Sequence, residues 1–580
     1  MTERAADPVG RLLLGLAAVA VMFAAADTYV VVLALPEMMT SAGLSAEDLQ
    51  EAAPIISGFL LGYVGALPLV GRIADLRGRL PVLVGSLVMF TFGSLVTATA
   101  YDLPSMVAGR VVQGIGAGGL LPATLALVAD LYPPRRRGLP LGIVGAVQEF
   151  GNVLGPLYGA VVLAVGSWRD IFWINMAVGL VLAAVIRRTR PVRRGVDWVG
   201  LALTVAILAC VLLVMVQPAS LADDITLGLA FLPVTGSSRW TAPLALAALV
   251  LLLLLVVRCL TATHPLVDLR SWRQTLGRVD VAGALLLTIA LGGVILAFAT
   301  ADPSVQVFSP AGPWLLLASA VAAAGFWWRN RTVQHPLVPG GAVSATPAWG
   351  SMLVSFFIGS ALIAALVDIP IFARITVYSE SQLMAALVLV RFLVGLPVGA
   401  FLGGWWTHHA PAGLVTAAGM AASTVGFGWM SRWGLESLRD PVATVPLLLA
   451  GLGVGLAIAP VNAALLASTQ DTVHGVASAL LVVARTIGKL IGISALTTIG
   501  LRRYYAAQQD LPAPTEVCPH GRSRCAAFTE ILREAGLTQL HTIFVGAAVC
   551  CLLAGLVAVL VFRRAQTREV RTHALRGELG

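Results

Sequence analysis

Long apolar runs recur along the whole of this 580-residue chain, and they constrain its fold more than any other feature. A helix needs about 20 mostly apolar residues to cross the roughly 30 Å hydrocarbon core of a bilayer. Six such runs lie in the first third, four in the middle and six at the end. They span about 12–36, 52–71, 80–100, 104–130, 138–165, 169–186, 197–217, 242–259, 280–300, 313–328, 349–372, 382–406, 411–431, 445–468, 474–503 and 541–562. We therefore predict an all-α polytopic membrane protein with about sixteen transmembrane helices.

The composition excludes several other classes of protein. The chain is 58% hydrophobic and 12% charged, whereas soluble domains have about 25% charged residues. These values exclude a cytosolic enzyme, a disordered chain and a nucleic-acid-binding module. The formal charge of +9 comes mainly from arginines in short loops, such as Arg135 to Arg137 and Arg187 with Arg188. Basic loops stay in the cytoplasm, so we predict the bacterial inner (plasma) membrane, with both termini cytoplasmic.

The four central runs look like one hairpin that has been duplicated. Asp197 and Asp280 each open a run, and the same tetrapeptide His-Pro-Leu-Val follows each pair of runs, at 264–267 and 335–338. Two similar loops found independently remain the alternative, but two matched landmarks in the same order favour duplication. The predicted domains are an N-terminal six-helix bundle at 1–190, a linker with two transmembrane hairpins at 191–345 and a C-terminal six-helix bundle at 346–580.

A short charged turn follows the second run. Its residues Gly71, Asp75, Arg77, Gly78 and Arg79 stand in the order G-R-I-A-D-L-R-G-R. Glycine permits a tight turn between two helices. The acid and the two arginines can form a charge cluster at the cytoplasmic surface, where we expect conformational gating.

Two further motifs lie inside spans. Arg110 is followed by Gln113 and Gly114 in the fourth run. The fifth run carries Gly151, Gly155, Pro156 and Gly159. Small residues four apart let helix backbones approach closely, and a proline loosens the helical hydrogen bonds locally.

Taken together, these motifs resemble those of the major facilitator superfamily. The turn resembles its signature between helices two and three, and the fifth-run pattern resembles the one associated with antiporters that export. The stretch at 26–36 resembles the first-helix signature of the 14-helix drug:proton antiporter branch. The resemblance implies two six-helix bundles that work by alternating access. This chain departs from the branch in carrying four central helices where two are usual.

A closer resemblance is to the mycobacterial triacylglyceride exporters. It rests on the stretches at 27–32, 148–151, 366–368 and 482–485. Those exporters work with a periplasmic lipid-binding lipoprotein. The resemblance therefore implies extraction of lipid from the inner membrane, with such a lipoprotein as a partner.

Charged residues at bilayer depth are costly and are by default functional. Asp27 and Glu149 are acids in the N-terminal half, and a carboxyl group there can take up a proton outside and release it inside. Arg110 would hold a carboxylate ionised and then release it. Arg485 and Lys489 share one helix face, and Asp27 or Glu149 would close an ion pair with them across the two halves in one state. The alternative is that each polar group only fixes helix packing; Asp368 and Arg391 are further buried candidates.

The last-but-one run extends beyond the membrane. It can continue as a helix to about 509, and together with the returning segment it predicts an extracellular extension at about 503–540. Cys518 and Cys525 lie in that segment and can form a disulfide in an oxidising compartment. A metal site with His520 or His541 is the alternative, but the spacing fits no standard zinc pattern, so we expect no metal.

Three classes of function remain after these observations. The first is a proton-coupled exporter of hydrophobic molecules, with lipids such as triacylglycerides favoured and a multidrug:proton antiporter as the alternative. The second is a membrane sensor or scaffold that does not transport. A membrane enzyme is the weakest, because the sequence has no metal cluster, nucleophile elbow or phosphate loop. We expect a monomer that needs no cofactor, binds no nucleic acid and is driven by the proton gradient.

Overall fold

The computed structural model describes residues 8–44, 49–133, 136–189, 197–224, 226–236, 238–299, 309–339, 342–378, 381–509, 517–518 and 526–565. In this part of the chain the regular structure is helical throughout, without a β-strand. Each of the sixteen expected spans is a helix of at least 19 residues. Thirteen of them are long and apolar enough by themselves to cross a membrane. The prediction of an all-α polytopic fold is therefore confirmed.

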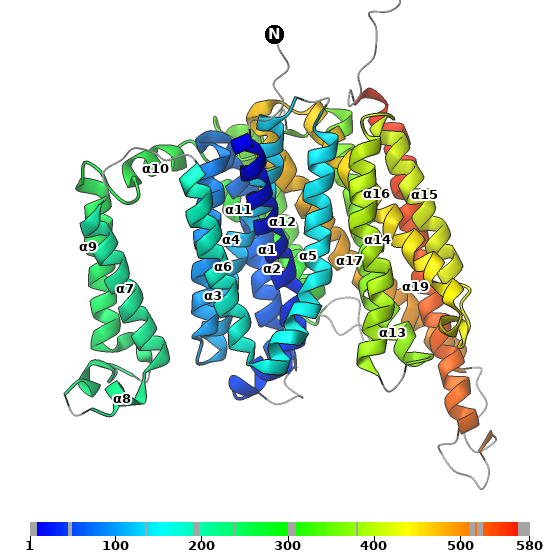
Figure 1. Ribbon diagram of the computed structural model, residues 1–580, viewed down its shortest axis with the longest axis horizontal. Coiled ribbons are helices and arrows are strands. Elements are labelled where there is room, and N and C mark those ends of the chain that lie inside the picture. Colours follow the sequence, from blue (N-terminus) through cyan, green and yellow to red (C-terminus); the bar gives the residue numbers. More distant parts are fainter. Residues whose placement is uncertain are drawn as a thin grey trace, which may run out of the picture.

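The first six helices form one bundle (Figure 1). They are α1 (Pro8–Ser41), α2 (Leu49–Arg77), α3 (Arg79–Ala98), α4 (Leu103–Leu131), α5 (Gly138–Val165) and α6 (Trp168–Thr189). Local sequence sets their ends. Gly78 has φ +92°, so a glycine suits the sharp turn between α2 and α3. Asp102 accepts from the backbone N–H of Ser105 at 2.9 Å and Ser105 Oγ accepts from the Asp102 N–H at 3.2 Å, which caps the start of α4.

The last six long helices form the second bundle (Figure 1). They are α13 (Thr346–Ile375), α14 (Gln382–Trp406), α15 (Ala412–Met430), α16 (Thr444–Ser468), α17 (His474–Gln509) and α19 (Ala526–Val561). Glycines bring α14 and α16 into backbone contact, because a Cβ atom at Gly399 or Gly403 would meet the backbone of α16. This close packing of small residues is how membrane helices associate without a hydrophobic driving force between them.

The two bundles meet mainly along two helix pairs, α2 with α17 and α5 with α14, while α4 with α17 and α5 with α16 add further contacts. Gly71 and Gly475 bring the first pair together, since a Cβ atom on Gly71 would lie 2.6 Å from the Gly475 carbonyl oxygen. In the second pair, a Cβ atom on Gly142 would lie 2.8 Å from the Gly404 Cα. Both contacts lie near the end of the molecule where α1 begins and α19 ends, which we call the termini face (Figure 1).

The central segment forms two hairpins joined by a short helix. The first pairs α7 (Trp198–Val216) with α9 (Pro243–Thr261), and the second pairs α11 (Val281–Ala299) with α12 (Gly312–Thr332). The connecting helix α10 (Leu269–Leu276) lies at the level of the termini face (Figure 1). Short turns α8 (Ala219–Ala222), η3 (Gly228–Ala230) and η4 (Arg239–Thr241) close the first hairpin at its other end.

The hairpins contact the N-terminal bundle in different ways. The second packs α11 on α2, where Thr288 Oγ1 donates to the Gly65 carbonyl at 3.1 Å. The first stands to one side (Figure 1). It reaches the bundle through Met215, whose sulfur accepts from Thr99 Oγ1 at 3.4 Å, and through Arg239, which lies over the Tyr101 ring at 4.0 Å.

The same acid–arginine pair closes both hairpins. Asp197 caps α7 and pairs with Arg258 at 3.1 Å, while Asp280 precedes α11 and pairs with Arg329 at 2.7 Å. These repeated contacts support the predicted duplication, which remains an inference.

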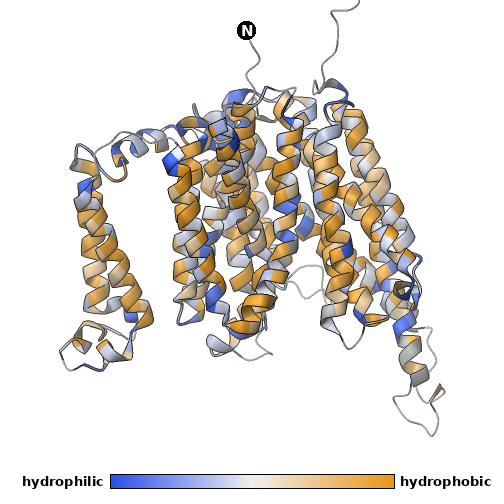
Figure 2. Cartoon of the chain, viewed as in Figure 1, coloured by the Kyte–Doolittle hydropathy of each residue, from blue (hydrophilic) through white to orange (hydrophobic). Residues whose placement is uncertain are grey.

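Helices α17 and α19 run 36 residues each, on the order of 54 Å at 1.5 Å per residue. They extend beyond the other helices at the face opposite the termini (Figure 1). Apolar residues cover the lengths of the bundled helices, whereas polar residues collect near their ends (Figure 2).

We expect Gly71→Ala to separate α2 from α17 at the termini face, because its Cβ atom would meet the Gly475 backbone oxygen. Spin labels placed on exposed positions of the two helices near that face would show a longer or broader distance distribution by pulsed EPR. Gly85→Ala on α3 is the matched control, since nothing lies within 4 Å of the added atom. Equal distributions for both variants would contradict the role of Gly71.

Candidate functional site

A buried ion pair occupies the interior of the N-terminal bundle. Asp27 on α1 is 1% exposed, and its Oδ2 lies 2.6 Å from Nη1 of Arg110 on α4. Its Oδ1 accepts from Asn175 Nδ2 at 2.5 Å and from Gln113 Nε2 at 3.0 Å. Both carboxylate oxygens therefore accept hydrogen bonds, which is the condition under which a charge is tolerated at this depth.

The other groups around Arg110 hold its guanidinium in place. Its Nη1 also donates to Gln113 Oε1 at 2.6 Å, and its Nε donates to the Ile55 carbonyl at 3.3 Å. The rings of Phe59 and Phe172 lie 4.3 Å and 5.7 Å from the guanidinium carbon. Aromatic faces attract such a cation and exclude water around it, so the pair lies in surroundings of low dielectric.

The glycines of the fifth-run motif place α1 against α5. A Cβ atom on Gly151 or Gly155 would meet backbone oxygens of α1, and one on Gly159 would meet the side chain of Val30. Pro156 lies in the same stretch of α5. The atom that Gly155 approaches is the carbonyl oxygen of Ala26, the residue before Asp27, so this motif sets the position of the acid.

The second predicted acid faces the other bundle. Glu149 on α5 is 2% exposed and accepts from Asn152 Nδ2 at 2.7 Å. Arg485 on α17 donates from its Nε to Ser355 Oγ at 3.2 Å and interacts electrostatically with Glu149. No direct ion pair joins Arg485 to Glu149 or Asp27 within the described chain. The structure thus brings the expected partners near each other across the two halves, without closing the expected pair.

Three further charged residues lie within helices of the C-terminal bundle. Lys489 is one turn beyond Arg485 on α17. Asp368 on α13 is 3% exposed within the C-terminal bundle, and Arg391 on α14 donates to Thr444 Oγ1 at 3.1 Å. None of these contacts joins either acid of the N-terminal half.

A second polar cluster, which we call the termini-face cluster, joins the two bundles at the termini face. Both Asp75 oxygens accept backbone N–H groups at the start of α17, from Gly475 at 2.8 Å and from Val476 at 3.1 Å. A carboxylate is favourable at this position because a helix N-terminus carries unpaired N–H groups and a partial positive charge. Arg79 lies 3.6 Å from Asp75 and 3.2 Å from Asp130 of α4.

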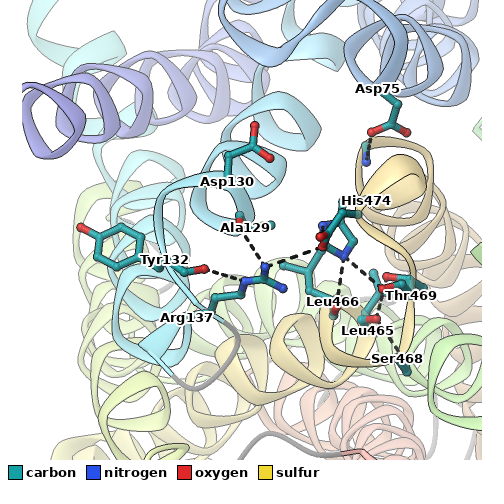
Figure 3. Close-up of polar contacts among 12 residues, drawn as sticks. Asp75, Ala129, Asp130, Tyr132, Arg137, Leu465, Leu466, Ser468, Thr469 and His474 are labelled. Atoms are coloured by element: carbon teal, nitrogen blue, oxygen red, sulfur yellow. Dashed lines mark hydrogen bonds and ion pairs between the residues drawn. The ribbon is translucent and has the colours of Figure 1, made fainter. Parts of the chain in front are cut away.

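Arg137 extends this cluster on the other side (Figure 3). It precedes α5 and donates to the carbonyls of Ala129 at 2.8 Å and Tyr132 at 3.0 Å. It also lies 3.9 Å from Asp471, in the turn before α17. Burial lowers the pKa of Arg137 from its usual value, and the nearby acids oppose that change. His474 begins α17, with its Nε2 3.1 Å from the Leu466 carbonyl oxygen (Figure 3).

Arg77, the other arginine of the predicted charged turn, binds a different element. Its Nε donates to Thr275 Oγ1 at 2.9 Å, a terminal nitrogen contacts Ser271, and the guanidinium lies 4.4 Å from the Trp272 ring. All three partners belong to α10. Arg77 therefore joins the linker to the turn between α2 and α3, whereas Arg79 pairs with Asp75.

Comparison with known proteins identifies the family. The sequence model of the family described as Major Facilitator Superfamily matches residues 17–330 of this chain. A triacylglyceride transporter of Mycolicibacterium smegmatis is 32% identical over 561 residues, which cover 93% of this chain and 86% of that protein. One from Mycolicibacterium hassiacum is 34% identical over 575 residues, covering 96% and 93%. The chain belongs to the major facilitator superfamily. It is thus a membrane transporter, as the motifs predicted.

Solved structures of this superfamily share its fold. The human organic anion transporter MFSD10 aligns with a TM-score of 0.51 and 14% identity, covering 95% of this chain and all of that chain. The proton:xylose symporter XylE aligns with a TM-score of 0.50 and 14% identity, covering 93% and 94%. At this identity the likeness concerns the fold alone.

The sequence did not predict several residues of the two polar sites. Asn175 completes the Asp27 site, and Ser94 Oγ accepts from Gln113 Nε2 at 3.0 Å. Arg137, Asp471 and His474 join the termini-face cluster. The signal for Asn175 was present, because a lone amide inside an apolar span is costly unless it is bonded. These three residues of the termini-face cluster lie at helix ends, where polar side chains are common and carry no such signal.

The structure describes only one of the two cysteines of the predicted disulfide. Cys518 is disulfide-bonded, and Cys525 lies outside the described residues, as does His520. His541 instead has its Nε2 2.6 Å from the Trp433 carbonyl oxygen. No group of three metal-binding side chains occurs where the structure describes the chain.

We expect Arg110→Gln to destabilise the purified protein by about 3–5 kcal/mol, because it leaves the Asp27 carboxylate buried without its cation. The double variant Asp27→Asn with Arg110→Gln should recover much of this loss. Thermal unfolding in detergent would measure both effects. Arg439→Gln is the control, since its ion pair with Glu436 is largely exposed and should contribute little. Equal losses in the single and double variants would show that the ion pair is not the cause.

Proposed function

We propose that this transporter is a proton-coupled exporter of lipids of the triacylglyceride class, located in the bacterial inner membrane with both termini in the cytoplasm. The identity of 32–34% to mycobacterial triacylglyceride transporters, over nearly the whole chain, is the observation that carries the choice of substrate. The arginine-rich loops support the orientation, which makes the termini face the cytoplasmic face.

The coupling is proposed to use the two buried acids. In the present conformation Arg110 matches the charge of Asp27, and Glu149 lies within electrostatic reach of Arg485. A proton arriving from the outer side would neutralise Asp27 and weaken its hold on Arg110. Because these groups belong to helices of the N-terminal bundle and to the interface between the bundles, such a change would alter how the bundles fit together.

The termini-face cluster is proposed to be the cytoplasmic gate. Asp75 binds the N-terminus of α17, and Arg137 faces Asp471 in the turn before it. The two bundles are joined at this face by these polar contacts and by the glycine contacts of α2 with α17 and of α5 with α14. Polar and small-residue contacts of this kind can be broken and remade in each cycle, as alternating access requires.

The projecting ends of α17 and α19 are proposed to serve the release of lipid on the outer side. Long helices that continue past the bilayer can shield an apolar substrate or dock a periplasmic lipid-binding lipoprotein. We propose that the transporter works as a monomer with such a partner, needs no cofactor and is driven by the proton gradient.

The substrate is tested by lipid mass spectrometry in a host that lacks the native gene. The host would carry the native protein, Asp27→Asn, Glu149→Gln, or Glu436→Gln as a control with an exposed acid. We expect triacylglycerides to accumulate in the inner membrane with Asp27→Asn and Glu149→Gln, and not with the other two. Unchanged lipid profiles would contradict lipid export and favour drug efflux.

The coupling is tested separately with the purified protein in vesicles. An imposed proton gradient should drive lipid across the membrane for the native protein and for Glu436→Gln. Asp27→Asn should lower the gradient-driven rate by about tenfold or more while the variant still inserts into the membrane. Absence of any gradient-driven movement by the native protein would contradict transport and favour a sensor or scaffold.

A further inference from the structure

A pocket of about 460 Å³ lies at the base of the second hairpin, at the termini face. It is an open pocket between the end of α10, the start of α11 and the end of α12. Its walls include Leu276, Asp280, Val281, Arg329, Gln334 and His335. These residues lie outside the Asp27 site and outside the termini-face cluster, so neither accounts for them.

The pocket contains a cation with unused hydrogen-bond donors. Arg329 donates from its Nε to Asp280 Oδ1 at 2.7 Å, while its side chain remains 38% exposed. Within the described chain, no residue bonds its two terminal nitrogens. A guanidinium in this position can bind a phosphate group with two parallel hydrogen bonds.

Comparison of the two hairpins shows that the second leaves an acceptor unused. In the first hairpin Asp197 Oδ1 binds Gly200 N–H and Arg258, and its Oδ2 accepts from the Leu266 N–H at 3.1 Å. In the second, Asp280 Oδ1 binds Gly283 N–H and Arg329. Its Oδ2 is buried and has no partner among the described residues. A buried acceptor without a partner is costly, so a ligand whose hydrogen-bond donor reaches it through a small shift of the pocket wall would stabilise this copy.

An apolar track leads from the pocket along α11 toward the centre of the bilayer. Val281 lines the pocket, and Leu285 and Ile289 follow it at intervals of four residues on the same helix face. These three side chains are 41%, 59% and 53% exposed. Trp327 and Trp328 near the end of α12 are 58% and 68% exposed. Exposed tryptophans of this kind lie at the headgroup level of a membrane, which places the pocket at that depth.

We propose that this pocket binds the headgroup of a membrane phospholipid with a hydrogen-bond donor beside its phosphate, as in phosphatidylethanolamine. The phosphate pairs with Arg329, the ammonium donates toward Asp280, and an acyl chain follows Val281, Leu285 and Ile289. The site is separate from the Asp27 site and from the termini-face cluster, and it does not depend on the proposed substrate.

Native mass spectrometry of the full-length protein in detergent tests this proposal, with phosphatidylethanolamine as the probe. The variant His335→Glu adds a negative charge to the pocket without removing the pair of Asp280 with Arg329. Its matched control is His264→Glu, at the equivalent position of the first hairpin. Both histidines are exposed, so neither change should disturb folding. We expect His335→Glu to weaken lipid binding by at least about tenfold, equivalent to about 1.4 kcal/mol, and His264→Glu to leave it within about twofold.

Two other outcomes would overturn the proposal. Equal binding by the native protein and His335→Glu would show that the lipid lies elsewhere. Soluble glycerophosphoethanolamine, which has the same headgroup but no acyl chains, should compete only weakly. If it bound as tightly as the lipid, the pocket would be a site for a soluble phosphate ester.

Discussion

The ion pair of Asp27 with Arg110 is the interaction on which the N-terminal bundle depends. Two opposite charges at bilayer depth are tolerated only if they are paired and fully hydrogen-bonded. That requirement brings in groups from several helices: Gln113 from α4, Asn175 from α6 and, through Gln113, Ser94 from α3. Arg110 also donates to the Ile55 carbonyl of α2. The bundle is therefore fixed around a polar centre, and a change in the charge of that centre affects five helices at once.

Contacts between the two halves are of a different kind from contacts within them. Glycines bring backbones together at α2 with α17 and at α5 with α14, and side chains such as Ala479 and Val482 pack into the core of the N-terminal half. The polar contacts at the termini face use a helix N-terminus and a few charged side chains. A buried polar network inside the N-terminal half, with small-residue packing and surface polar contacts between the halves, suits two units that move relative to each other.

The linker is also connected to the N-terminal bundle, through α2. Arg77, at the end of α2, binds three residues of α10, and α11 packs directly on α2. The second hairpin is thus attached to the helix that carries Asp75 of the termini-face cluster, whereas the first contacts the bundle mainly at the opposite face. The two hairpins share the same acid–arginine closure but have different surroundings, which agrees with a role for the second that the first does not have.

The sequence alone determined the number and type of the spans, the superfamily and the acids at bilayer depth. These follow from local properties: the length of an apolar run, the spacing of glycines and the cost of a charge in hydrocarbon. Only the tertiary structure decided which groups these charged residues bind. Asp27 binds Arg110, 83 positions away, and Asn175, 148 positions away. Arg77 binds residues of α10 and not Asp75, the acid two positions before it. Such choices depend on how each helix is rotated and packed against its neighbours, and no local pattern records that.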